Sequence, residues 1–163
     1  MKRLAVLACA LALTLPVHAD EKVGVGETAP GYAFEHPEVF TAQLLWGVAH
    51  GARLLALACA EHGKGAAAEA WVDWQEREQP QILAAGRVLG RHYFGVEDVA
   101  PDAVAAALGL KPSLALPSEM LDPACATLRE ALAQPRYDLI RFREKTLEAL
   151  RRGPGPDPVE VLK

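Results

Sequence analysis

The residues best suited to hold a metal or move a proton are four histidines beyond the first nineteen residues. They are His36, His50, His62 and His92. No two of them stand four residues apart, so no single helix presents two histidine ligands one turn apart. His50 and His62 are twelve residues apart and point in different directions around a straight helix. A metal site would need histidines from separate helices to converge, and we predict neither a metal nor a cofactor.

Carboxylates and hydroxyls are the next candidates for catalysis. Glu69 and Asp73 are one helical turn apart, a spacing typical of a solvated helix face with ion pairs inside the helix. Glycoside hydrolysis instead needs two carboxyl groups that face each other across a cleft. Ser113 and Ser118 are the only serines, and neither lies in a G-x-S-x-G motif. A G-x-x-x-x-G-K-[ST] phosphate loop is absent as well. We therefore predict that the protein is not an enzyme.

Two tryptophans beside a charged helix face are the candidate binding surface. The candidate contact residues are Glu69, Trp71, Asp73, Trp74 and Glu76. The three carboxylates would favour a basic protein or peptide of the cell envelope. An alternative hypothesis places the two tryptophans with residues 92–94 in a groove for a peptide or glycan. Aromatic residues at helical spacing are more often core residues, so a buried cluster is the third interpretation.

The first nineteen residues indicate the compartment of the protein, and the compartment determines whether its cysteines are expected to form a disulfide. Lys2 and Arg3 precede an apolar run over residues 4–15, and Pro16 and the sequence Val-His-Ala follow it. This order is typical of a secretory signal peptide that is cleaved after Ala19. We therefore expect residues 1–19 to be a signal peptide and the protein to be periplasmic, with secretion beyond the periplasm as the alternative.

Cys59 and Cys125 are the two cysteines that remain after such cleavage. In an oxidising compartment two cysteines usually pair, and a bond over a loop of this length stabilises a fold by roughly 4 kcal/mol. Two buried free thiols are the alternative, because both cysteines lie on apolar helix faces. We predict the disulfide, with the two Cα atoms within about 7 Å of each other.

The charge balance excludes some partners. The formal net charge is −4, and loss of Lys2 and Arg3 would make the chain more acidic. An acidic domain is poorly suited to nucleic acid or to an anionic membrane surface. No apolar run beyond residue 19 looks long enough to span a bilayer. The acidic excess is concentrated in residues 20–85, where it either pairs with basic late helices or meets a basic partner.

The segment 37–61 predicts a buried central helix. Between residues 52 and 60 only Arg53 is polar, and a helix that is apolar on nearly all sides belongs inside a core. One face at helical spacing includes Leu55 and Cys59, so we expect Leu55→Asp to be among the most damaging substitutions. Gly47 and Gly51 would let a neighbouring helix approach closely.

Prolines and glycines set the other helix limits. Pro80 would end a helix or kink it, and Pro135 would break another. Asp122 followed by Pro123 is a strong helix start, with the aspartate as cap and the proline in the first turn. In the last helix, Leu139, Ile140 and Phe142 should face inward. The expected helices cover residues 37–61, 65–78, 80–94, 101–108, a stretch from 122, and 136–152.

These elements predict an all-α, compact single-domain bundle of about five or six helices around a buried central helix. Residues 20–35 should form an irregular arm, residues 36–152 the helical domain, and residues 153–163 a flexible tail rich in proline and glycine. The favoured function is an exported binding or interaction protein without catalytic activity. The alternative is a small metal-dependent or hydrolytic enzyme that uses clustered histidines and carboxylates.

Overall fold

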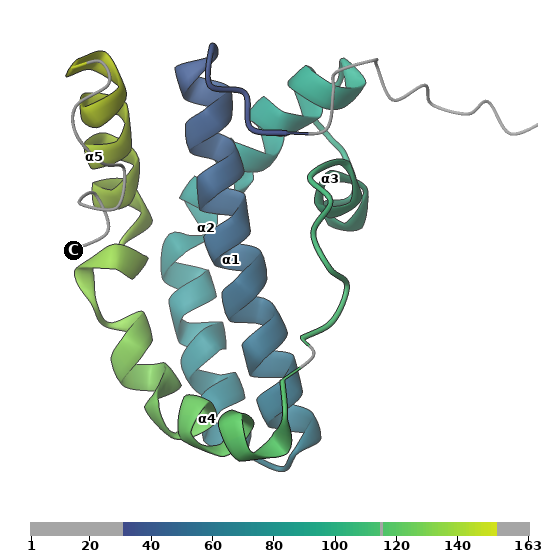
Figure 1. Cartoon of the computed structure of the whole chain (residues 1–163), viewed down its shortest axis with the longest axis vertical. Helices are drawn as coiled ribbons and strands as arrows, with labels where there is room; N and C mark the ends of the chain where they lie inside the picture. The colour runs from purple at the N-terminus through teal and green to yellow at the C-terminus, as the bar shows by residue number, and fades with distance from the viewer. Residues whose placement is uncertain (1–30, 115, 153–163) are drawn as a thin grey trace, which may run out of the picture.

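A computed structural model describes residues 31–114 and 116–152 of the chain. Within these ranges the protein is all-helical and has no strand, which confirms the predicted fold class (Figure 1). The predicted signal peptide, most of the predicted arm and the predicted tail lie outside the described residues. The elements are α1 (Pro37–Glu61), α2 (Gly65–Phe94), α3 (Pro101–Ala107), α4 (Ser118–Leu132), the short 3-10 helix η1 (Pro135–Tyr137) and α5 (Leu139–Arg152).

The two longest helices, α1 and α2, form an antiparallel pair at the centre (Figure 1). The chain reverses between them at Gly63, whose φ of 72° lies in the left-handed region that glycine adopts readily. Helices α4 and α5 pack on one side of the pair, and α3 packs against α2 on another. The predicted helix over residues 37–61 is therefore confirmed, and it lies in the centre of the bundle as expected.

Pro80 does not end α2; of the two alternatives that the sequence suggested there, an end is wrong and a kink stays a prediction. The helix runs without a break from residue 65 to residue 94. Proline removes one backbone hydrogen bond, which the carbonyl of Glu76 would otherwise accept. Both Glu76 and Pro80 are exposed, so water can satisfy that carbonyl. The halves on either side of Pro80 both pack against other helices, and this packing outweighs the local cost.

Two predicted helix starts are wrong. Helix α4 begins at Ser118 and contains Pro123, rather than starting at Asp122. Leu121 is buried in the core, so packing extends the helix upstream of the proline. The last helix begins at Leu139, and residues 135–137 form the separate turn η1 instead. Tertiary packing outweighs the local signal of Pro123, whereas Pro135 does separate α4 from the last helix, as predicted.

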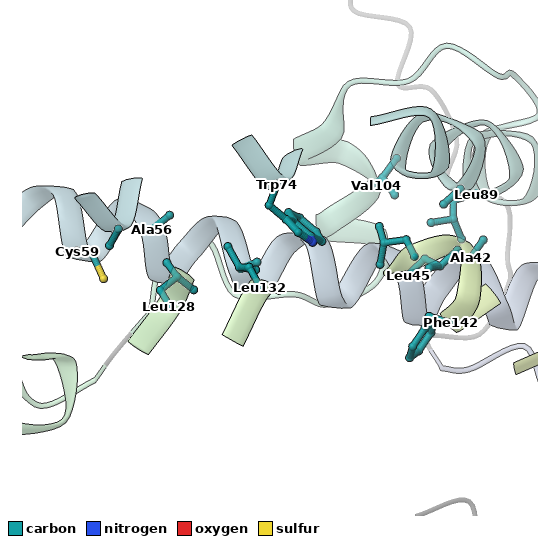
Figure 2. Close-up of a cluster of buried hydrophobic side chains, with 14 of the residues drawn as sticks. Ala42, Leu45, Ala56, Cys59, Trp74, Leu89, Val104, Leu128, Leu132 and Phe142 are labelled. Carbon is teal, nitrogen blue, oxygen red and sulfur yellow. The ribbon is translucent and has the colours of Figure 1, made fainter. Parts of the chain in front are cut away.

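The core follows the α1–α2 pair along its length (Figure 2). The largest fully buried side chains include Trp74, Leu89, Leu139 and Val104. On α1 the buried face carries Leu45, Ala52, Ala56 and Cys59, and the other expected core residue, Leu55, is only half-buried at the edge. Leu55 lies about 60° around the helix from Ala52 and about 40° from Cys59, at the border of that face.

Two further expectations about packing are wrong. Ile140 is 54% exposed, whereas its neighbours Leu139 and Phe142 are buried. A Cβ atom at Gly47 or Gly51 would meet no atom within 4 Å, so these glycines do not serve a close helix contact. The close approaches instead occur on α2, where the cavity described below is formed.

Helix α1 also has the length and apolar composition needed to cross a membrane. The expectation that no such segment exists beyond residue 19 is therefore wrong by these two criteria. The same composition is found in core helices, and here the buried face of α1 contacts α2, α4 and α5. Its apolar character is accounted for by that packing.

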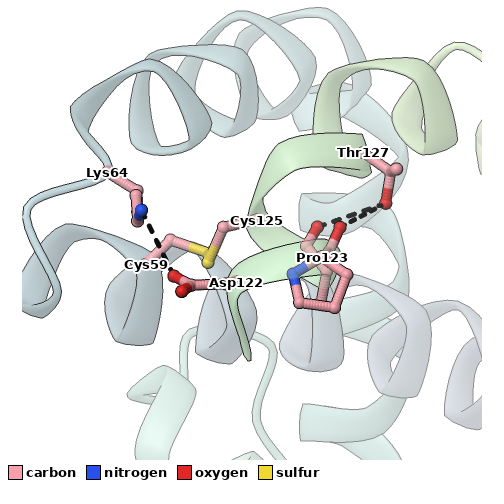
Figure 3. Close-up of a disulfide and its surroundings, with 7 residues drawn as sticks. Cys59, Lys64, Asp122, Pro123, Cys125 and Thr127 are labelled. Carbon is pink, nitrogen blue, oxygen red and sulfur yellow. Dashed lines mark hydrogen bonds and ion pairs between the residues drawn. A yellow bond between two sulfur atoms is a disulfide. The ribbon is translucent and has the colours of Figure 1, made fainter. Parts of the chain in front are cut away.

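A disulfide joins Cys59 at the end of α1 to Cys125 in α4, as predicted (Figure 3). Their Cα atoms are 5.6 Å apart. Beside the bond, the Lys64 ammonium lies 3.2 Å from the Asp122 carboxylate. The bond closes a loop that includes all of α2 and α3, so it fixes α4 against the end of the central pair.

Candidate functional site

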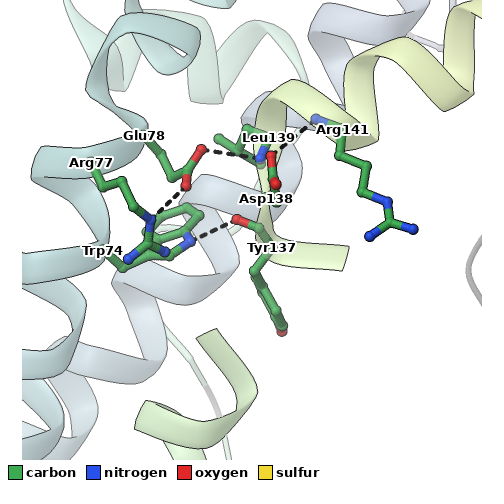
Figure 4. Close-up of polar contacts among 7 residues, drawn as sticks. All are labelled: Trp74, Arg77, Glu78, Tyr137, Asp138, Leu139 and Arg141. Carbon is green, nitrogen blue, oxygen red and sulfur yellow. Dashed lines mark hydrogen bonds and ion pairs between the residues drawn. The ribbon is translucent and has the colours of Figure 1, made fainter. Parts of the chain in front are cut away.

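One face of α2 holds the C-terminal part of the chain in place (Figure 4). The indole Nε1 of Trp74 donates a hydrogen bond of 2.8 Å to the carbonyl of Tyr137. One carboxylate oxygen of the buried Glu78 accepts a hydrogen bond from the backbone N–H of Leu139, the first residue of α5, and the other accepts one from Arg77. A carboxylate at a helix N-terminus is favourable because unpaired N–H groups point toward it. Trp74 and Glu78 are therefore structural residues.

The five residues predicted to contact a partner do not share one environment. Glu69, Asp73 and Glu76 are exposed, and the Asp73 carboxylate lies 3.7 Å from the Arg129 guanidinium. Trp71 is half-buried, whereas Trp74 is only 1% exposed. The acidic residues thus form a solvated stripe, and Trp74 could touch a partner only through the cavity described next.

A cavity of about 680 Å³ lies between α1, α2 and the segment that leads into α3. Its volume is within the range of roughly 300–1,000 Å³ that is usual for ligand pockets. All three tryptophans of the chain, Trp46, Trp71 and Trp74, contribute to its lining. Gln75 and Gln79 supply amide groups, and Ile82, Leu83 and Val99 add apolar surface. An apolar pocket with a few polar groups is the usual form of a small-molecule site.

Residues 92–94 do not belong to this cavity, contrary to the groove hypothesis. His92 follows Trp74 by eighteen residues of one continuous helix, which is about 27 Å along its axis. The third tryptophan that lines the cavity is Trp46 of α1. The glycines of α2 were a sequence signal for a close approach to this helix, but they could not show which side chain approaches it.

Two glycines of α2 shape one end of the cavity. A Cβ atom at Gly86 would lie 3.0 Å from Cζ3 of Trp46, so the indole ring rests directly on the helix backbone there. A Cβ atom at Gly90 would lie 2.5 Å from the carbonyl oxygen of Val96. Gly86 and Gly90 are one helical turn apart. Trp46 therefore packs on α2 one turn away from the point where the segment after α2 packs on the same helix.

Charged groups of both signs line the cavity. The Arg53 guanidinium lies 3.7 Å from the Asp102 carboxylate, and Glu97 is paired with Arg91. Arg87 and Asp98 also line the cavity, yet neither forms an ion pair with any residue that the structure describes. Both are exposed at the rim, where water solvates them.

One buried polar atom of the lining residues has no hydrogen-bond partner among the described residues. The indole Nε1 of Trp71 is buried and makes no hydrogen bond within residues 31–114 and 116–152. A buried donor without an acceptor costs about 1–3 kcal/mol. The chemically identical group of Trp74 is satisfied by Tyr137. The difference sets Trp71 apart from the structural residues of the same helix.

Two histidines of the described residues, His36 and His92, lie close to each other. The ring centroids of His36 and His92 are 6.0 Å apart. Burial lowers the pKa of His92, and the nearby His36 lowers it further. His50 lines the cavity, with its Nε2 atom 2.7 Å from the carbonyl oxygen of Lys111. In the part of the chain that the structure describes, no three histidine, cysteine, aspartate or glutamate residues are grouped as a metal site would require.

Comparison with known proteins adds no family to this picture. The chain matches no protein-family model, no curated protein and no solved structure.

Proposed function

We propose that this is a small, exported, non-catalytic binding protein that holds a ligand of the cell envelope in the cavity between α1 and α2. The observation that carries the proposal is the gathering of all three tryptophans around one cavity of about 680 Å³. The unpartnered indole N–H of Trp71 supports it. Export follows from the sequence of residues 1–19 alone and is part of the proposal.

The tryptophans also supply the test, because intrinsic fluorescence in this protein comes mainly from side chains that line the cavity. We expect the low-molecular-weight fraction of a periplasmic extract to change the emission of the purified protein in a saturable way. Mass spectrometry of the retained compound would then identify the ligand. A saturable change that persists when the cavity is blocked would contradict the proposed site.

Leu83 and Leu57 offer a matched pair for blocking it. They are 52% and 46% exposed on the two long helices, but only Leu83 lines the cavity. Leu83→Arg should abolish the ligand-dependent change, whereas Leu57→Arg should leave it intact. Both variants should melt close to the parent protein, because substitutions at exposed sites usually change stability by less than about 0.5 kcal/mol.

The acidic stripe of Glu69, Asp73 and Glu76 remains a second candidate for contact with a basic partner. Its support is that all three carboxylates are exposed. If such a partner binds there, Asp73→Lys should weaken binding at low salt, and added salt should weaken the parent complex too, since screening acts over about 10 Å. Binding that is unaffected by both changes would eliminate this surface.

A further inference from the structure

The two unpaired charges of the cavity lie at its glycine end. Arg87 is three residues before Gly90 on α2 and is therefore its neighbour on the helix surface. Asp98 belongs to the segment whose backbone rests on Gly90, through the carbonyl oxygens of Val96 and Glu97. The fold thus carries a cation on the α2 wall and an anion on the facing segment, at the end where Trp46 lies on Gly86.

These two charges are not used to hold the fold together. Arg53 with Asp102, and Arg91 with Glu97, already link the helices to the segment around α3. Arg87 and Asp98 line the same cavity without pairing with each other. A ligand with both an anionic and a cationic group could contact both side chains, and its charges would then replace the water that solvates them.

Resting on the proposed function, we infer that the ligand is a zwitterionic amino acid or short peptide with a bulky apolar side chain. Its carboxylate contacts the guanidinium of Arg87, and its ammonium group contacts the carboxylate of Asp98. The apolar side chain packs on Trp46 and the aliphatic lining. Gln75 and Gln79 can donate and accept hydrogen bonds with the peptide groups of a longer ligand. A lipid acyl chain has no polar groups that could form these hydrogen bonds.

Calorimetry and tryptophan emission with defined probes would test this inference. The probes are leucine, Leu-Leu and Leu-Leu-Leu-Leu, together with N-acetyl-Leu-Leu and Leu-Leu-amide. We expect at least one of the three uncapped probes to bind, and which one binds best tells a free amino acid from a short peptide. Each cap removes one charge, so N-acetyl-Leu-Leu and Leu-Leu-amide should each bind about two- to fivefold more weakly than uncapped Leu-Leu, because ion pairs with exposed side chains are weak.

Variants assign each charge to its residue. Arg87→Gln should weaken binding of free Leu-Leu but not weaken Leu-Leu-amide further, because that probe has no carboxylate. Asp98→Asn should weaken free Leu-Leu but not weaken N-acetyl-Leu-Leu further. Arg141→Gln and Glu130→Gln serve as controls, since both residues are exposed and lie outside the cavity.

The failure of this inference can be told apart from failure of the proposed function. Equal binding of capped and free peptides would show that the ligand is not a zwitterion, while the cavity remains a binding site. The same conclusion follows if no probe binds but an extract compound still causes an emission change that Leu83→Arg abolishes. If binding of these probes survives Leu83→Arg, the cavity itself is wrong and both proposals fall.

Discussion

Two faces of α2 both carry tryptophan and charged side chains, but these polar groups are bonded to protein on one face and lack partners among the described residues on the other. Toward α5, the indole N–H of Trp74 is bonded to Tyr137, and both oxygens of Glu78 accept hydrogen bonds (Figure 4). Toward the cavity, the indole N–H of Trp71 is unpartnered, and Arg87 forms no ion pair with any described residue. The first face is complete without a ligand, whereas the second leaves donors and charges unused.

The difference separates structural residues from candidate binding residues on one helix. Satisfied buried polar groups position a neighbouring element, and removing one partner leaves the other buried and unpaired. Unsatisfied groups around a cavity add nothing to the fold, so they are free to contact something else.

The largest effect is expected for the two neighbouring tryptophans. Trp74→Ala removes a fully buried ring and its hydrogen bond, and large-to-small core substitutions of this kind cost about 3–5 kcal/mol. Trp71→Ala removes a half-buried ring whose N–H has no partner, so its cost should be well under half as large. Denaturant unfolding of both variants measures the comparison. Equal losses in the free energy of unfolding would show that Trp71 is as much a structural residue as Trp74.

A smaller loss is expected when the support of α5 is removed. Glu78→Ala leaves the N–H of Leu139 without its acceptor, which should cost about 1–3 kcal/mol in the free energy of unfolding. The control is Glu76→Ala, an exposed carboxylate two residues earlier, which should change it by less than about 0.5 kcal/mol. Hydrogen exchange should show earlier opening of α5 in the Glu78 variant. Unchanged protection there would refute the role given to this carboxylate.

The glycines of the two long helices should respond with opposite signs. Gly90→Ala places a Cβ atom 2.5 Å from a backbone oxygen, so the segment after α2 must move and thermal stability should fall. Gly47→Ala meets nothing within 4 Å and should raise stability by roughly 0.5–1 kcal/mol, because alanine favours the helix. Thermal melts of both variants decide the matter, and a rise in both would show that Gly90 is not needed for the cavity wall.

The smallest effect concerns pH. Burial, and then the nearby His36, lower the pKa of His92 from its ordinary value of 6.5. The folded chain therefore binds this proton more weakly than the unfolded chain, so stability from this group is present above pH 6.5 and declines as the pH falls below it. NMR titration should show that His36→Gln raises the pKa of His92 only in part, since burial is the larger cause. His62→Gln, at the exposed end of α1, should leave it unchanged.

Much of the fold could be predicted from local signals. The apolar stretch before Cys59 identified the central helix, and the cysteine pair identified its link to α4. The readings of Pro80 as a helix end and of Pro123 as a helix start are wrong because each proline lies in a helix that packs on both sides of it. Local propensity costs a few kcal/mol at such a residue, and the buried faces on either side contribute more.

The site was predicted only in part. Trp71 and Trp74 were singled out from the sequence, yet tertiary structure alone showed that Trp74 is hydrogen-bonded in the core and that Trp71 has a buried N–H without a partner among the described residues. Trp46, Arg87 and Asp98 carry no sequence motif. They line one cavity, at which Gly86 admits a ring against α2 and Gly90 admits a backbone segment.

The amino-acid sequence by itself determined the helical class and the central helix, because helix propensity and apolar periodicity act locally. It also determined the cysteine pairing, because two cysteines beyond residue 19 allow only one pair. The tertiary structure decided where helices begin around prolines, which tryptophan is buried, and which charges remain unpaired. Those properties depend on contacts between segments far apart in the chain, such as Trp74 with Tyr137 and Gly90 with Val96. Such contacts form only when the helices pack, so no local pattern records them.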